Sequence, residues 1–138
     1  PPPEKSVSRR KITNFLGFIS DSINDSSGSY TRSVMAAISE IRLHRNSTPS
    51  PDDYLKVIEN YDTVLTELTS SGNDVALKAT ILSRKGNIQK ELYHFTGEND
   101  QGYLIAAKEC LESSLETSPF EVSQDLVTLE QINNLLTS

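Results

Sequence analysis

Apolar residues recur at three- and four-residue steps along most of this chain, and that spacing places them on one face of an α-helix. Six such stripes can be followed, within residues 12–23, 30–45, 54–68, 75–95, 103–115 and 122–136. No stretch alternates between apolar and polar positions for long enough to predict a strand. The pattern therefore predicts an all-α protein of about six helices, joined by short loops and packed as antiparallel neighbours.

Turn-forming residues separate these stripes and define one domain. Residues 1–7, PPPEKSV, are typical of an extended tail or linker, and 24–29, NDSSGS, of a loop. The pattern Ser-Pro-x-acid occurs at 50–53 and again at 118–121. It supplies a capping hydroxyl, a proline in the first turn and a nearby acid, which together favour a helix start. We expect residues 8–138 to form a single all-helical domain.

The predicted helices differ in how many apolar faces they carry. The first has one stripe, formed by Ile12, Phe15, Leu16, Ile19 and Ile23. The second also has one stripe, formed by Tyr30, Val34, Ala37, Ile38 and Ile41, with Arg45 at its end. The fourth has two, formed by Val75, Ala79, Leu82 and Gly86 and by Leu77, Ile81, Ile88, Leu92 and Phe95. A helix that is apolar on two sides is sandwiched between neighbours, so the fourth is predicted to lie centrally.

Small and large residues alternate at helical spacing in AAKECLESSLETSP, residues 106–119. Ala107 and Ser114 are small, Leu111 between them is large, and a proline ends the stretch. Small residues let two helix backbones approach, and a large residue fills the space beside them. This stretch resembles the second helix of a tetratricopeptide repeat, and Gly86 then matches the close-packing small residue of the preceding helix.

A second stretch, DDYLKVIENYDTVL at 52–65, resembles the same repeat helix. The resemblance implies a stack of helical hairpins, in which a groove between helix pairs receives a peptide or helix of another protein. The separation from Gly86 to Ala107 is longer than this repeat normally has, and the family's large aromatic residue near the start of each first helix is absent. A plain six-helix bundle is the alternative architecture.

Composition and charge narrow the classes of molecule that this chain could bind. The net charge is −6, yet residues 1–50 carry seven Lys and Arg against four acids, so the rest of the chain holds −9. An acidic C-terminal part repels nucleic acid and anionic lipid, which argues against either as a ligand. No apolar run approaches the roughly 20 residues of a membrane span. The start at proline suggests a domain excised from a larger protein, and the single cysteine suits a reducing compartment, the cytoplasm or nucleus.

Residues that could carry catalysis are few. Cys110 lies on an apolar stripe without an adjacent base, and His44 and His94 lie near helix ends, where histidine suits the helix dipole. The carboxylates fall on polar faces, and no glycine-rich phosphate loop or metal-ligand spacing is present. GENDQG, residues 97–102, lacks the spacing of a calcium loop and is interpreted as a turn. We therefore expect no enzyme activity, no cofactor and no metal.

The sequence best fits a scaffold or adaptor module that binds another protein. An acidic segment would complement the basic residues of the N-terminal part. Six residues that the core does not explain are expected to be exposed and to contact the partner: Phe18, Arg42, Arg45, Lys85, Asn87 and Tyr93. The alternative function is a structural or homo-oligomerisation bundle within a larger protein.

Overall fold

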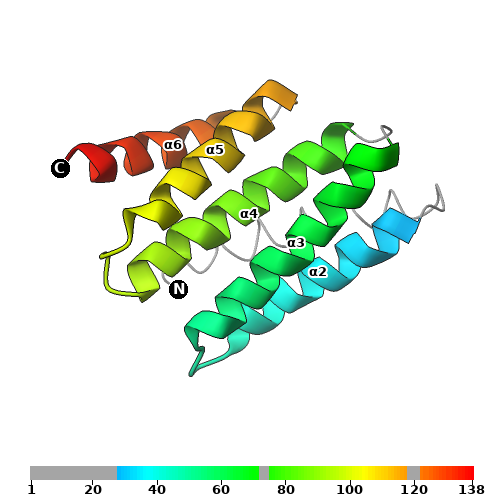
Figure 1. The fold of residues 1–138 in the computed structure, drawn as a ribbon, viewed down its shortest axis with the longest axis horizontal. Coiled ribbons are helices and arrows are strands. Elements are labelled where there is room, and N and C mark those ends of the chain that lie inside the picture. Colours follow the sequence, from blue (N-terminus) through cyan, green and yellow to red (C-terminus); the bar gives the residue numbers. More distant parts are fainter. Residues whose placement is uncertain (1–27, 72–74, 118–121) are drawn as a thin grey trace.

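The computed structural model describes residues 28–71, 75–117 and 122–138, and every element in these ranges is an α-helix. The helices are α2 (Gly28–Arg45), α3 (Pro51–Ser71), α4 (Val75–Phe95), α5 (Gln101–Thr117) and α6 (Val122–Thr137), which follow one another back and forth across the molecule (Figure 1). The all-helical prediction is confirmed. The helix predicted around 12–23 lies outside the described residues.

Local hydrogen bonds explain where the helices begin and end. The backbone N–H of Ser50 donates to Asp53 Oδ2 at 2.8 Å, so the acid after the first-turn proline reaches back to cap α3. At the end of α4, the N–H of Glu98 donates to the carbonyl of Tyr93 and that of Gly97 to the carbonyl of His94. Gly97 has a φ of 89°, which favours glycine at this position of a helix-ending motif. The predicted turn is therefore confirmed over residues 97–100, and its last two residues, Gln101 and Gly102, begin α5 (Gln101–Thr117).

Helix α4 separates two apolar cores, as its two stripes predicted. The first core joins it to α2 and α3 and contains Ala36, Ala37, Leu43, Val57, Tyr61, Val64, Leu68, Leu77, Ile81 and Ile88. The second joins it to α5 and α6 and contains Tyr93, Leu104, Ala107, Leu111, Leu129 and Ile132. The two predicted stripes are buried except at their ends, where Val75 and Phe95 are 57% and 41% exposed.

Helices α4 and α5 approach each other closely at Gly86. A Cβ atom added there would lie 3.0 Å from Leu111 Cγ and 3.1 Å from the Ala107 carbonyl oxygen. The hydroxyl of Ser114 also donates to the carbonyl of Ala79 at 2.8 Å. The sequence expectation that Gly86, Ala107 and Ser114 allow close helix packing is thus confirmed.

The prediction for α2 needs a correction. Its buried face consists of Ser33, Ala36, Ala37, Glu40 and Leu43. Of the apolar stripe, Ala37 is buried, Val34 and Ile41 are half-buried and Ile38 is exposed, whereas the side chain of Tyr30 lies outside the described part of the structure. The prediction failed because α2 packs through small residues, which bring it close to its neighbours, and because its buried carboxylate has partners that the linear pattern does not reveal.

Contacts between side chains show that alternate helices run parallel. Between α2 and α4, Glu40 contacts Arg84 and His44 contacts Glu91. Between α4 and α6, Ser83 contacts Asp125 and Lys90 contacts Gln131 in the same ascending order. Consecutive helices are antiparallel, and α3 and α5 pack against α4 as well. In the described fold α2, α4 and α6 therefore run in one direction, and α3 and α5 run in the opposite direction.

Candidate protein-binding face

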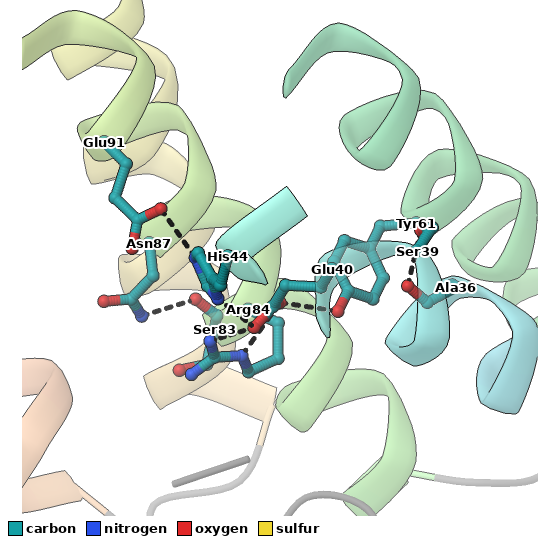
Figure 2. A network of polar contacts seen from close by, with 9 residues as sticks. All are labelled: Ala36, Ser39, Glu40, His44, Tyr61, Ser83, Arg84, Asn87 and Glu91. Atoms are coloured by element: carbon teal, nitrogen blue, oxygen red, sulfur yellow. Dashed lines mark hydrogen bonds and ion pairs between the residues drawn. The ribbon is translucent and has the colours of Figure 1, made fainter. Parts of the chain in front are cut away.

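A buried carboxylate joins the first three described helices. Glu40 of α2 is only 2% exposed, and its Oε1 accepts hydrogen bonds from the Tyr61 hydroxyl of α3 at 2.6 Å and from Arg84 Nε of α4 at 3.1 Å. Its Oε2 forms an ion pair with Arg84 Nη2 (Figure 2). This two-pronged guanidinium–carboxylate contact is the geometry that best offsets the loss of water around two charges.

The electrostatics of this cluster keep its charges in place. Burial alone would lower the pKa of Arg84, but the negative charge of Glu40 outweighs it and the pKa rises. Burial, and next the adjacent Glu40, raise the pKa of Tyr61 well above its ordinary value, so this phenol stays protonated and donates. The cluster thus consists of an ion pair without net charge and of the Tyr61 hydroxyl as a fixed donor. Together they orient α2, α3 and α4.

A histidine extends this cluster toward the surface. His44 Nε2 lies 2.9 Å from Glu91 Oε2, and its Nδ1 lies 4.0 Å from Glu40 Oε2 (Figure 2). The hydrogen bond to Glu91 raises the pKa of His44 above 6.5, although burial opposes it. The positive charge also lies in the last turn of α2, where it interacts favourably with the helix dipole.

A second polar cluster joins α4, α5 and α6. Asp125 is 6% exposed, and its carboxylate accepts from the Ser83 hydroxyl at 2.7 Å and lies 3.2 Å from the Ser114 hydroxyl. Nearby, Lys90 Nζ donates to Gln131 Oε1 at 2.7 Å. Each side of α4 therefore has both an apolar core and a polar cluster. The two clusters fix the parallel helices in register.

The surface between the two polar clusters is the candidate binding face. We call it the three-helix face and define it by His44 of α2, by Asn87, Lys90 and Glu91 of α4, and by Gln131 of α6. These residues are half-buried or exposed, and all have polar ends. Asn87 Nδ2 donates to the carbonyl of Ser83 one turn earlier at 2.7 Å, which restrains the orientation of its amide (Figure 2).

Four of the residues predicted to bind a partner have different surroundings. Arg42 and Arg45 are exposed at the end of α2, as expected. Lys85 is only 18% exposed in its side chain and pairs with Asp62 of α3, so it contributes to helix packing. Asn87 belongs to the three-helix face. The structure therefore does not bring Lys85 and Asn87 to a common surface.

Tyr93 was expected to be exposed, and that expectation is wrong. Its side chain is 5% exposed and belongs to the core between α4, α5 and α6. It lies seven residues after Gly86, so it continues the stripe of Val75, Ala79, Leu82 and Gly86, and this spacing could have identified it as a core residue. Phe18, the remaining predicted contact, lies outside the described residues.

Sequence reasoning also missed the polar residues that connect the helices. Glu40 follows Ser33, Ala36 and Ala37 at helical spacing, so a stripe of small residues was the available signal for a close contact. Asp125 lies seven residues before the core residue Ile132, which was the corresponding signal in α6. Their partners come from distant helices, and no local pattern could identify these.

The described residues contain little that suggests catalysis. Cys110 is buried, and burial raises the pKa of its thiol, which disfavours the nucleophilic thiolate. Across 28–71, 75–117 and 122–138, no three His, Cys, Asp or Glu side chains gather as metal ligands would. In the same ranges, no helix combines the length and apolar character needed to cross a membrane.

Comparison with known proteins adds no identity. No protein-family model, curated protein or solved structure matches this chain significantly. The inference of function therefore depends on the geometry of the helices and the chemistry of their surfaces.

Proposed function

We propose that this domain is a protein-interaction module, in which a peptide or helix of another protein lies along the three-helix face. The observation that carries the proposal is the parallel alignment of α2, α4 and α6, which the Glu40–Arg84 and Ser83–Asp125 contacts hold in register. Stacked helical hairpins with this alignment present one helix of each pair on a common surface, which extended ligands can follow.

The stack is tetratricopeptide-like in this proposal, with a longer repeat. Contacts between successive parallel helices connect residues 41 to 47 positions apart, such as Lys90 with Gln131 and His44 with Glu91. The helices of 16 to 21 residues account for this length, which exceeds the about 34 residues of the regular repeat. The close contact at Gly86 is the packing feature that the resemblance implied.

The face offers hydrogen-bonding groups more than apolar anchors. Its members include a carboxylate, an ammonium and two amides, and the exposed guanidiniums of Arg42 and Arg45 lie at the C-terminal end of α2. A partner segment that carries backbone or acidic acceptors would match these donors. We place Arg42, Arg45 and Asn87 among the contacts, and we no longer include Lys85 and Tyr93.

Affinity capture with matched variants tests the proposal. The full chain would be compared with Asn87→Arg, which places a long charged side chain in the middle of the three-helix face. The control is Thr63→Arg, which makes the same change of charge at an exposed position of α3. We expect at least one partner to be captured by both the wild type and the control but not by Asn87→Arg. Partners retained equally by all three proteins would contradict the proposal.

Homo-oligomerisation is the second candidate, and exposed apolar residues favour it. Leu126 and Val127 of α6 are 53% and 47% exposed, and such side chains commonly mark contact surfaces. Sedimentation over a range of concentrations separates the two functions. A mass that rises with concentration in the wild type and not in Leu126→Ser would favour self-association, whereas a constant monomer mass would exclude it.

A further inference from the structure

The link between α2 and α3 contains two hydroxyl residues, each followed by a proline. Residues 46–50, NSTPS, belong to no helix, and Pro51 begins α3. Thr48 precedes Pro49 and Ser50 precedes Pro51, and both hydroxyl residues are exposed. Proline-directed protein kinases select such pairs, because proline lacks the backbone N–H that any other residue would leave unpaired in the kinase site. The link therefore offers two acceptors for a phosphoryl group.

Thr48 is the better acceptor of the two. Its Oγ1 lies 3.5 Å from Asn46 Oδ1, which is longer than a normal hydrogen bond between two oxygens, so the hydroxyl is only weakly engaged. A residue before proline also favours extended backbone, and the chain after Thr48 stays outside the helices through Ser50. Ser50, in contrast, is followed directly by α3, and its N–H donates to Asp53 Oδ2 at 2.8 Å. A kinase that binds extended chain would have to unwind the first turn of α3 to modify Ser50.

We propose that Thr48 is the phosphorylation site of a proline-directed protein kinase, and that its phosphate pairs with the arginines at the end of α2. In this reaction Thr48 Oγ1 forms a bond to the γ-phosphorus of ATP, and ADP leaves with the electron pair of the broken P–O bond. The hydroxyl proton passes to the catalytic carboxylate of the kinase.

Positive charge lies close to Thr48. Arg45 precedes it by three residues, a separation of at most about 11 Å along the chain. Arg42 and Arg45 are exposed, and they share one side of α2 because they are three residues apart. A phosphothreonine carries a charge of about −1.5 to −2 at pH 7, and guanidinium groups bind phosphate oxygens through paired N–H donors. The phosphate is thus within reach of a complementary pair of cations.

The other charges near Thr48 oppose this attraction only in part. Asp52 and Asp53 repel a phosphate, but Asp53 already accepts a backbone N–H at the start of α3 at 2.8 Å. That helix start is also the positive end of the dipole of α3, which favours a nearby anion. His44, in the last turn of α2, is paired with Glu91. The two arginines are therefore the partners that suit the phosphate.

The modification has a consequence for binding, and this consequence alone rests on the proposed function. Arg42 and Arg45 are among the proposed contacts with an acidic partner segment. A phosphate that pairs with them would occupy their donors and repel that segment. Phosphorylation of Thr48 should therefore weaken capture of the partner.

Reaction of the full chain with ATP and a kinase tests the site. One cyclin-dependent and one mitogen-activated kinase would be used, and fragmentation mass spectrometry would locate the phosphate, since Ser50 and Ser118 also precede proline. We expect phosphate on Thr48 in the wild type and in the control Thr63→Ala. Pro49→Ala keeps the hydroxyl of Thr48 and should slow its modification at least about tenfold, because alanine restores the unpaired N–H.

A phosphorus NMR titration tests the pairing. A phosphothreonine loses its second proton near about pH 6, and nearby guanidiniums favour the dianion. The phosphate on Thr48 should thus have a lower pKa in the wild type than in the double variant Arg42→Gln with Arg45→Gln. Equal pKa values in the two proteins would overturn the pairing.

The remaining outcomes are separable. Phosphate on Ser50 alone, no phosphate on Thr48 from either kinase, or an equal rate in Pro49→Ala would overturn the site, whatever the chain binds. For the consequence, the partner that Asn87→Arg fails to capture would be offered to phosphorylated and unmodified wild type. We expect capture to fall at least about fivefold on phosphorylation, as the loss of an exposed ion pair would produce. Equal capture would overturn the link to binding.

Discussion

Single residues in this protein show how burial changes the meaning of a charge. Glu40 would be placed on a solvated face by its type alone, yet it is buried between three helices with a hydroxyl and a guanidinium as partners. Removing one partner of such a pair leaves the other charge buried and unpaired, which is far more costly than the net value of the pair.

The first prediction concerns this pair. Glu40→Ala should lower the free energy of unfolding by about 3 kcal/mol or more, because Arg84 and the Tyr61 hydroxyl lose their acceptor. Chemical denaturation followed by circular dichroism measures the change. Glu59→Ala, at an exposed position of α3, serves as the control and should change stability by less than about 0.5 kcal/mol. Similar losses in both variants would contradict the role of Glu40.

The second prediction concerns the close contact at Gly86. Alanine normally stabilises a helix by about 1 kcal/mol relative to glycine. Here its Cβ would press on the backbone oxygen of Ala107 and on Leu111, and overpacking costs about 1 to 3 kcal/mol. Gly86→Ala should therefore leave the protein less stable than wild type, and Gly86→Val less stable again. A higher thermal midpoint for Gly86→Ala would show that the two helices separate easily.

The third prediction concerns the pH dependence of His44. Its folded-state pKa lies above 6.5, so protonation favours the folded state. The stability that His44 contributes is fully present below about pH 6.5 and is lost as the pH rises through the folded-state pKa. The destabilisation caused by His44→Gln should thus be larger at pH 5.5 than at pH 8.5.

A titration of the His44 ring by NMR provides the matched measurement. Because Glu91 is the main cause of the raised pKa, Glu91→Gln should lower the pKa of His44 toward 6.5. An unchanged titration in that variant would mean that the contact between His44 and Glu91 does not persist in solution.

At the scale of elements, α4 organises the described fold. It supplies Leu77, Ile81 and Ile88 to one core and Tyr93 to the other, and it carries the partners of both polar clusters. The last helix, α6, has fewer such attachments. Leu129 and Ile132 bury its apolar side, and Asp125 in its first turn joins it to α4 and α5.

The fourth prediction follows from that attachment. Asp125→Ala should destabilise the protein by about 1 to 3 kcal/mol, because the Ser83 hydroxyl loses its acceptor and the link between α6 and α4 is broken. Hydrogen exchange should increase more in α6 than in α2, since the lost bond attaches α6 to the rest of the fold. Glu130→Ala, at an exposed position of the same helix, is the control. Equal protection of α6 in both variants would contradict this role.

At the scale of the molecule, the shared helix couples the two cores. Because α4 contributes side chains to both, neither core can lose α4 without disturbing the other. This coupling distinguishes the described fold from a chain of hairpins that do not share a helix.

The fifth prediction is therefore cooperative unfolding. Leu104→Ala removes a fully buried side chain from the second core and should lower stability by about 2 to 5 kcal/mol. The backbone amides of α3 lie on the far side of α4. Their free energy of protection against hydrogen exchange should fall by about as much as the stability of the whole protein. Hydrogen exchange followed by mass spectrometry provides the measurement. Full protection of α3 in this variant would show that the two cores unfold separately.

The comparison of pattern and structure shows where local signals end. The stripe of α3 and the double stripe of α4 predicted buried faces well, and the spacing around Gly86 and Ala107 predicted a close helix contact. Of the predicted partner contacts, Arg42 and Arg45 are exposed as expected, and Asn87 lies on the three-helix face. The neighbours of Lys85 and the burial of Tyr93 depend on other helices.

What the sequence determined by itself is the helical character of the described chain, because helix periodicity, caps and turn residues act over a few neighbouring positions. The tertiary structure decided which face of α2 is buried, because Glu40 became compatible with burial only when Tyr61 and Arg84 met it from two other helices. It also decided the parallel alignment of α2, α4 and α6. Contacts such as Ser83 with Asp125, 42 residues apart, exist only once the chain has folded back on itself.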